Sequence, residues 1–215
     1  MRGRFKVLSI AVLAAVALSA CSLPDFGSGP SPDLYVLSPK STFPDDLPSV
    51  DWQLVVEEPS TAKGIDTDRI AIAPSALEVK YLAGSRWADR APRMVQQLLI
   101  QSFENSKKIV SVGRQSIGLR SDYVLKVELR EFQAEKTPEG GTVAHVRVNL
   151  KLVRVALGQI VGSESFDFSK PANSENVSDI VQAFDDAVGA VLKRAVAWTL
   201  KAGEESKDKK PRDWK

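Results

Sequence analysis

Residues 123–130 read Tyr-Val-Leu-Lys-Val-Glu-Leu-Arg, a run in which apolar and polar side chains alternate. A strand with this pattern turns one face toward a core and the other toward water. After Pro-Glu-Gly-Gly at residues 138–141, a strong turn signal, the alternation returns over residues 146–152. The two runs therefore predict a long β-hairpin with one apolar and one polar face.

Further elements follow on both sides of this hairpin. Downstream, residues 160–168 predict a third antiparallel strand, and about 176–200 predict a helix with one apolar stripe that ends at Gly203. Upstream, a helix begins at Asp89 with Pro92 in its first turn. Four short strands precede it, at residues 33–37, 52–56, 69–73 and 77–81, the last of them broken by Gly84-Ser85. This order predicts an α+β fold, an antiparallel β-sheet with two long α-helices packed on one face.

The chain begins with a basic segment and a short apolar run over residues 7–17. This pattern is typical of a secretory signal peptide, and the run is too short for a transmembrane helix. The run leads into Leu18-Ser19-Ala20-Cys21, which resembles a bacterial lipobox with Cys21 as the lipidated residue. An ordinary signal peptide with a chance cysteine is the alternative. Ser22 rather than Asp follows the cysteine, and in two-membraned bacteria this favours export to the outer membrane.

Composition divides the chain into four segments. Residues 1–20 form the signal peptide, 21–32 the lipidated cysteine and a flexible Pro-, Gly- and Ser-rich tether, 33–202 the domain, and 203–215 a charged disordered tail. The leader holds three basic residues, so its removal changes 29 basic and 27 acidic residues into 26 and 27, a net charge of −1. Such a charge does not favour a nucleic-acid partner.

Candidate catalytic residues are few. His145, the only histidine, shares strand parity with Arg147 and Lys151, which places it on the polar face. Ser60 and Lys63 match the Ser-x-x-Lys of penicillin-recognising enzymes, as do residues 206–209, but the partner motifs Ser-Asp-Asn and Lys-Thr-Gly are absent from the sequence. The sequence therefore predicts a protein that is not an enzyme, with no catalytic residue, metal site or cofactor.

A candidate partner-binding site lies where the fourth strand meets the first helix. It consists of Tyr81, Arg86, Trp87 and Arg90. Tyr, Trp and Arg are the residue types enriched at the energetic centres of protein interfaces. The alternative is that Trp87 fills the core at the helix start while Arg86 pairs with a carboxylate.

Several short motifs follow one another in a definite order: Tyr35-Val36-Leu37, Ile70-Ala71-Ile72-Ala73-Pro74, Glu78-Val79-Lys80-Tyr81, Arg86-Trp87-Ala88, Tyr123-Val124-Leu125 and Phe132. In this order, over about residues 33–200, the chain resembles the auxiliary lipoproteins of ABC-type transport systems. The family includes the lipoprotein of the paraquat-inducible operon. The charged tail has no counterpart in that pattern.

The resemblance implies a non-catalytic lipoprotein that works with a permease, an ATPase and a membrane-anchored MCE-domain protein, which together move lipid across the envelope. The chain would bind the MCE-domain protein, or receive its lipid, at the periplasmic face of the outer membrane. Phospholipid as a ligand and a homo-oligomer as an assembly stay open. The alternative is an outer-membrane lipoprotein that activates a peptidoglycan synthase or supports envelope assembly, and a third possibility is an envelope hydrolase.

The lipid anchor gives a direct prediction. Cys21→Ser removes the only thiol in the chain, and the thiol is the acceptor for the lipid. We expect the precursor to stay unprocessed, or a soluble protein to be released, without radiolabelled palmitate in either case. Equal palmitate incorporation into the wild type and the variant would contradict the lipoprotein assignment.

Overall fold

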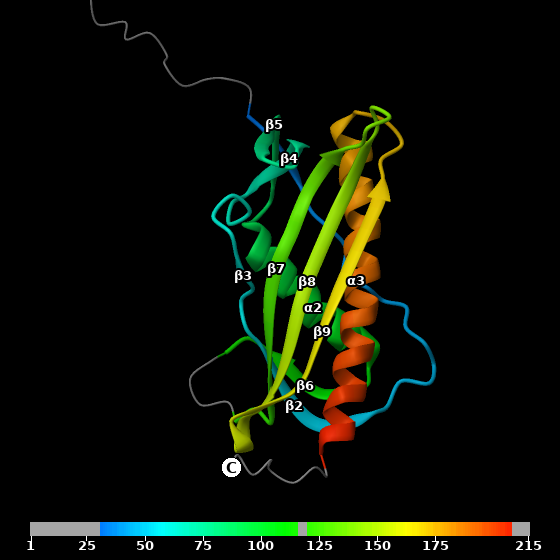
Figure 1. Ribbon diagram of the computed structural model, residues 1–215. Helices are drawn as coiled ribbons and strands as arrows, with labels where there is room; N and C mark the ends of the chain where they lie inside the picture. Colours follow the sequence, from blue (N-terminus) through cyan, green and yellow to red (C-terminus); the bar gives the residue numbers. More distant parts are fainter. Residues whose placement is uncertain (1–30, 116–119, 208–215) are drawn as a thin grey trace, which may run out of the picture. The chain divides into compact units, whose positions relative to one another are not determined.

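The computed structural model describes residues 31–115 and 120–207, and its central element is the long strand β7 (Tyr123–Lys136). Along one edge β7 pairs antiparallel with β8 (Thr142–Arg154), which in turn pairs antiparallel with β9 (Gln159–Pro171). Figure 1 shows the three strands side by side. The short 3-10 helix η2 (Val155–Leu157) joins β8 to β9. The predicted hairpin and the third antiparallel strand are therefore confirmed.

The opposite edge of β7 carries three shorter strands, placed one after another along its length. They are β2 (Val50–Val56), β3 (Ser60–Thr61) and β4 (Arg69–Ser75), and all three run parallel to β7. β2 pairs with the first residues of β7, β3 with its middle and β4 with its end. One long strand thus aligns three short ones that could not form a sheet alone.

The outer strands complete a mixed sheet. β5 (Glu78–Trp87) pairs antiparallel with β4, β1 (Asp33–Tyr35) pairs parallel with β5, and β6 (Ile109–Gly113) pairs parallel with β2. The α+β class is confirmed. The expected antiparallel sheet is found in β7–β8–β9 and in β4–β5, whereas the other pairings are parallel. Periodicity identifies strands but does not reveal their partners, so the parallel pairs could not be read from the sequence.

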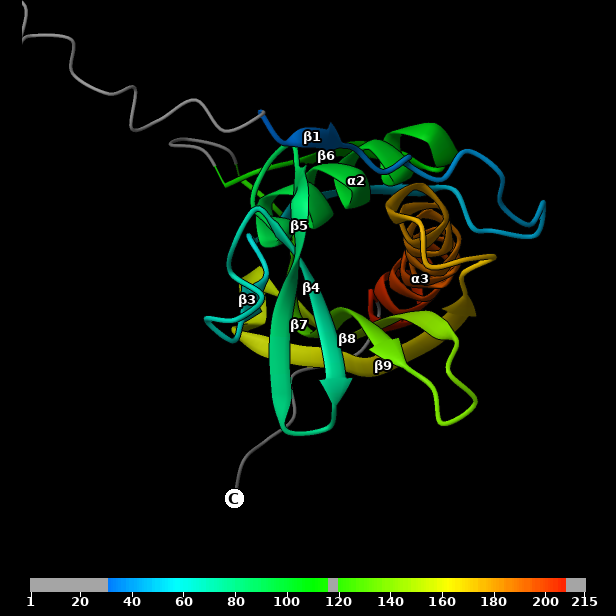
Figure 2. The same cartoon turned by 90° about the horizontal axis from the view of Figure 1, so that it is seen from above.

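Two helices, α2 (Ala91–Ser106) and α3 (Val177–Ser206), lie on the same side of β7–β8–β9, as expected (Figure 2). The apolar face of the hairpin meets them, and it is almost completely buried at Leu125, Leu129 and Leu150. The helices contribute Phe103 and Phe184, both 0% exposed. Burial of each such side chain stabilises the fold by about 1.5–3 kcal/mol, so this layer is the main source of stability.

Gly84 does not break the fourth strand. It has a φ of 67°, a left-handed conformation that glycine adopts without strain, and β5 continues past it to Trp87. Pairing with β1, at Asp33↔Ser85 and beyond, holds this second half in the sheet. The first helix consequently begins at Ala91 instead of Asp89.

The last helix also runs further than expected. It continues past Gly203 to Ser206, so the predicted boundary of the tail at residue 203 falls inside the helix. Residues 208–215 lie outside the described part of the chain. Gly203 is a contact position, because the indole ring of Trp52 lies directly against it. Tyr123 donates a hydrogen bond from its hydroxyl to the Gly203 carbonyl oxygen at 3.0 Å.

This contact predicts an unusual effect of alanine. In Gly203→Ala the new Cβ would overlap Trp52 Cζ2 and lie 3.0 Å from Cε2 and Cη2. Trp52 is 3% exposed and packs edge-on against Tyr123, with ring centroids 4.8 Å apart, so it has little room to move. Alanine favours a helix over glycine by about 1 kcal/mol. We nevertheless expect a net loss of about 1–3 kcal/mol in the free energy of unfolding, measured with urea.

Gly189 in the same helix is the matched control, because a Cβ there would meet nothing within 4 Å. Gly189→Ala should raise the free energy of unfolding by up to about 1 kcal/mol. Equal stabilisation by both substitutions would show that α3 does not approach Trp52 closely.

Candidate functional site

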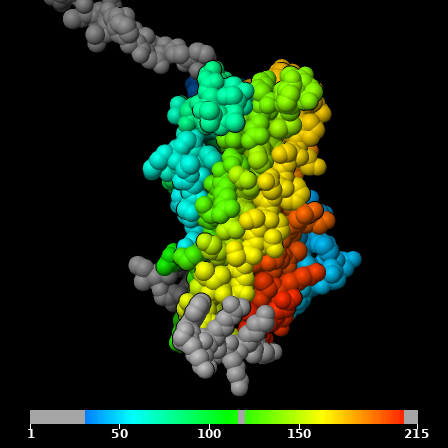
Figure 3. All heavy atoms as spheres, in the orientation of Figure 1, coloured from blue at the N-terminus to red at the C-terminus, as the bar shows by residue number. Residues whose placement is uncertain are grey.

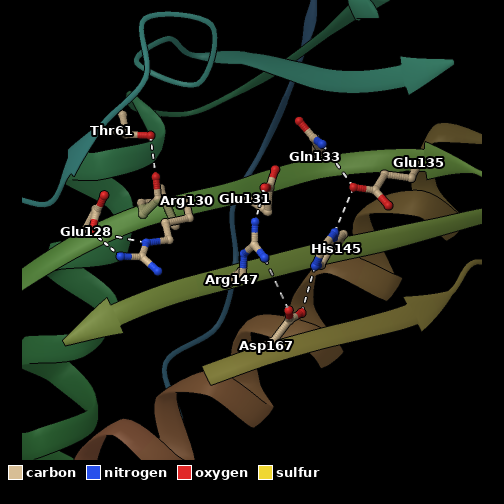
Figure 4. Close-up of polar contacts among 10 residues, drawn as sticks. Thr61, Glu128, Arg130, Glu131, Gln133, Glu135, His145, Arg147 and Asp167 are labelled. Atoms are coloured by element: carbon tan, nitrogen blue, oxygen red, sulfur yellow. Dashed lines mark hydrogen bonds and ion pairs between the residues drawn. The ribbon is translucent and has the colours of Figure 1, made fainter. Parts of the chain in front are cut away.

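Polar side chains gather on the face of β7–β8–β9 that is turned away from the helices. A change of register between Leu129 and Glu131 produces this arrangement. Before it the odd-numbered side chains of β7 are buried, and after it the even-numbered ones, Phe132 and Ala134, are buried. This bulge turns Glu131 and the alternate residues that follow it outward. Together with two residues of β8 and one of β9 they form the outer-face network: Glu131, Gln133, Glu135, His145, Arg147 and Asp167 (Figure 4).

His145 is held between two carboxylates. Its Nδ1 lies 2.8 Å from Glu135 Oε1, and its Nε2 lies 2.8 Å from Asp167 Oδ1. Partial burial alone would lower the pKa of His145, but the hydrogen bonds and negative charges of Glu135 and Asp167 outweigh it and raise this pKa above its usual value. For Glu135, burial opposes the hydrogen bonds from Gln133 and His145, which prevail and lower its pKa.

Arg147 extends the network across the same three strands. Its Nη2 donates to Glu131 Oε1 at 2.6 Å, and its Nη1 lies 3.9 Å from Asp167 Oδ2. Asp167 on β9 thus faces both His145 and Arg147 on β8, and each of these also contacts a glutamate of β7. The network therefore ties three strands together through opposite charges placed across the sheet.

The geometry does not resemble a hydrolase site. In a Ser-His-Asp triad one imidazole nitrogen faces a carboxylate and the other faces the nucleophile. Both nitrogens of His145 face carboxylates, so neither is placed to take a proton from a hydroxyl group. A cavity of about 410 Å³ opens nearby, between Glu131, Glu135 and the end of β4, and His145 does not line it.

The serine and the lysine of the Ser-x-x-Lys match contact different groups. The hydroxyl of Ser60 faces the Val127 carbonyl oxygen at 3.5 Å, and Lys63 Nζ faces Asp66 at 3.4 Å, so the two side chains have separate partners. Within residues 31–115 and 120–207, no group of three or more His, Cys, Asp or Glu side chains is arranged to hold a metal ion. In the same part of the chain, neither helix is long and apolar enough to cross a membrane. Cys21 lies outside the described residues.

Trp87, one of the four candidate partner-binding residues, is a core residue. It is 1% exposed. Its ring centroid lies 5.7 Å from that of Phe132 and 5.2 Å from that of Phe184. The second of the two interpretations of Trp87 therefore describes its place in this structure, and Trp87 presents no surface to a partner.

The other three candidates, Tyr81, Arg86 and Arg90, converge on the loop formed by residues 64–68. We call these three residues and the loop the junction cluster. Arg86 Nη1 donates to both carboxylate oxygens of Asp68, at 3.1 and 2.9 Å. Tyr81 donates from its hydroxyl to the Gly64 carbonyl oxygen at 3.1 Å. Arg90 pairs with Asp66. The structure thus brings together residues that are up to 26 positions apart in the chain.

The carboxylates of this loop respond to the arginines. Arg90, through a hydrogen bond that outweighs partial desolvation, lowers the pKa of Asp66, and the pKa of Arg90 rises for the same reason. Arg86 lowers the pKa of Asp68 in the same way. Sequence reasoning missed both aspartates. Their one signal is the Asp-x-Asp spacing before a strand, and it does not identify the arginines that meet them.

The outer-face network predicts a pH-dependent contribution to stability. Because the pKa of His145 is higher in the folded state, protonation favours folding. The contribution is fully present below the ordinary histidine pKa of about 6.5 and is lost as the pH rises through the raised value. His145→Gln should therefore lower the urea midpoint most at about pH 5.5, and its effect should diminish toward about pH 8.5.

Arg130→Gln is the control for this measurement. Arg130 lies on β7 and pairs with Glu128, and arginine stays charged over the whole range, so its effect should not change with pH. A His145→Gln effect that was equally flat would contradict the raised pKa.

Comparison with known proteins places the chain in a family. A family model described as "ABC-type transport auxiliary lipoprotein component" matches residues 35–196. A crystal structure of a protein from Xanthomonas campestris is 31% identical, with a TM-score of 0.78, and the match covers 82% of this chain and 99% of that one. A crystal structure of an uncharacterized protein is 14% identical, with a TM-score of 0.61 over 77% of this chain and 97% of that one, and it supports the fold alone.

An uncharacterized protein of Bradyrhizobium diazoefficiens is 29% identical over 149 residues, or 69% of this chain. The match covers 40% of that relative, so the chain spans less than half its length. The family match extends from the end of β1 into the second half of α3, so it includes nearly all of the described fold. The chain therefore belongs to the family of ABC-type transport auxiliary lipoprotein components.

Proposed function

We propose that this protein is a non-catalytic, lipid-anchored component of an ABC-type lipid transport system, bound to the MCE-domain protein of that system. The observation that carries the proposal is the family match over residues 35–196. The anchor is Cys21, and Ser22 after it favours the periplasmic face of the outer membrane. The pairing of both His145 nitrogens with carboxylates supports a role without catalysis.

The junction cluster is the surface that we assign to the partner. Arg86 is 44% exposed and its partner Asp68 is 40% exposed. An ion pair this open to water contributes about 0–1 kcal/mol to folding. Arg86 can therefore exchange Asp68 for a carboxylate of a partner with little loss of stability, and arginine is enriched at the centres of interfaces. Arg90 is less free to exchange, because it contacts both Asp66 and Glu58.

The identity of the partner is tested by purifying the tagged full chain from detergent-solubilised membranes and identifying the proteins that come with it by mass spectrometry. We expect the MCE-domain protein, with its permease and ATPase. Recovery of a peptidoglycan synthase in their place would contradict the proposal and favour the alternative function.

The binding surface is tested with two matched variants. Arg86→Ala should reduce the amount of recovered MCE-domain protein by about tenfold, the loss typical of a central interface arginine. Arg130→Ala removes a pair of similar exposure, 43% and 47%, from the outer face and should leave recovery unchanged. Both variants should melt within a few degrees of the wild type, because each loses one exposed ion pair. Equal recovery of the MCE-domain protein with both variants would show that the interface does not include the junction cluster.

A further inference from the structure

The hairpin of β4 and β5 extends beyond the packed sheet. Every residue from 75 to 80 is exposed, so neither face of this segment is covered. The last pair between β4 and β7 is Ala73↔Glu135, and the hairpin closes two residues later with the pair Ser75↔Glu78. We call residues 75–80 the hairpin tip. In Figure 3 it stands at one end of the domain as a group of teal atoms.

The side chains at this tip are apolar where turn residues are usually polar. Ala76 and Leu77 form the turn, a place where Gly, Asn, Asp, Pro and Ser predominate in proteins. Leu77 is 100% exposed and Val79 is 50% exposed. The core does not use these two side chains, so the fold gives no reason for their being apolar.

The charges of the tip cancel each other. Glu78 lies between Leu77 and Val79 in the sequence, and Lys80 follows Val79. The side chains of Glu78 and Lys80 form an ion pair at 2.8 Å. A tip with no net charge approaches an apolar phase more easily than one with a free carboxylate, since an unpaired charge is costly to desolvate. The tip thus combines exposed apolar side chains with a compensated pair of charges.

The described chain begins beside β5, the strand that also carries part of the tip. β1 runs parallel to β5 and pairs Asp33 with Ser85, which lies five residues beyond the last residue of the tip. Figure 2 shows β1 beside one end of β5 and the turn between β4 and β5 at the other end of this strand. Residues 21–32 connect Cys21 to this point. The flexible tether predicted for these residues would have an end-to-end spread of roughly 20 Å, which is comparable with the length of a short strand and so allows the anchor and the tip to reach one surface.

We propose that the hairpin tip inserts into the lipid surface that holds the anchor, with Leu77 and Val79 at the boundary between headgroups and acyl chains. Apolar side chains bind at this depth in peripheral proteins, in proportion to the apolar area they bury. The tip then forms a second contact with the membrane, and it fixes which face of the domain is turned toward the periplasm. This inference rests on the lipid anchor of the proposed function.

The test uses an environment-sensitive fluorophore on Leu77→Cys in the full, lipidated chain. Cys21 is the only native cysteine and its thiol carries lipid in the proposed form, so the new thiol is labelled alone. The protein is reconstituted into vesicles of phosphatidylethanolamine and phosphatidylglycerol. We expect blue-shifted emission and several-fold stronger quenching by spin-labelled acyl chains than for the control variant.

Val155→Cys is that control, because Val155 is 46% exposed and lies in the β8–β9 connection, at the opposite end of the hairpin β7–β8. Flotation with the vesicles is scored first, and protein that does not float would overturn the anchor and this inference together. If the protein floats but the fluorophores at both positions report a water environment, the insertion of the tip is contradicted and the anchor is not. A blue shift seen only at high protein density would show that the tip contacts a second copy of the chain. A blue shift seen only after the MCE-domain protein is added would show that the tip contacts that partner. Either result would overturn lipid insertion.

Discussion

The structure depends on the two-sided pairing of β7. One edge of this strand holds the hairpin partner β8, and the other aligns β2, β3 and β4 in succession. A slip of one residue would turn Leu125 and Leu129 out of the core and bring charged side chains in, so the register is strongly specified. The bulge after Leu129 then reverses the parity, and this places Glu131 and Glu135 opposite Arg147 and His145. The register and the bulge of β7 thus determine both which side chains enter the core and which form the outer-face network.

Periodicity was sufficient for the hairpin, the third strand and both helices, because each of them buries a complete face. It could not supply β3, which has two residues, or the parallel neighbours of β7, because those contacts depend on the arrangement of distant segments. The two errors in element length concern glycines that sequence rules treat as terminators. Gly84 lies within a strand held by β1, and Gly203 lies within a helix pressed against Trp52. In both places a tertiary contact overrides the local preference.

The candidate site was only partly predictable. Strand parity placed His145 on the polar face correctly, but its partners could not be foreseen. The outward position of Glu135 depends on the bulge in β7, and that of Asp167 depends on the register of β9. Residue type suggested an interface at the junction cluster, and for Tyr81, Arg86 and Arg90 this stays a prediction. Trp87 is buried in this structure, which agrees with the second interpretation of it as a core residue.

The described part of the chain itself supplies partners for the side chains of the outer-face network, but it supplies none for the apolar side chains of the hairpin tip. A perturbed pKa often marks a catalytic group, but ion-pair networks perturb pKa values too, and the carboxylates on both sides of His145 account for its shift without a substrate. The side chain of Leu77 has no such explanation, because burying it requires a surface that residues 31–115 and 120–207 do not offer at the tip. The charged groups around His145 therefore have partners within the described chain, whereas Leu77 has none there. Of these two features, the tip is therefore the one whose side chains can be buried only by a surface outside the described chain.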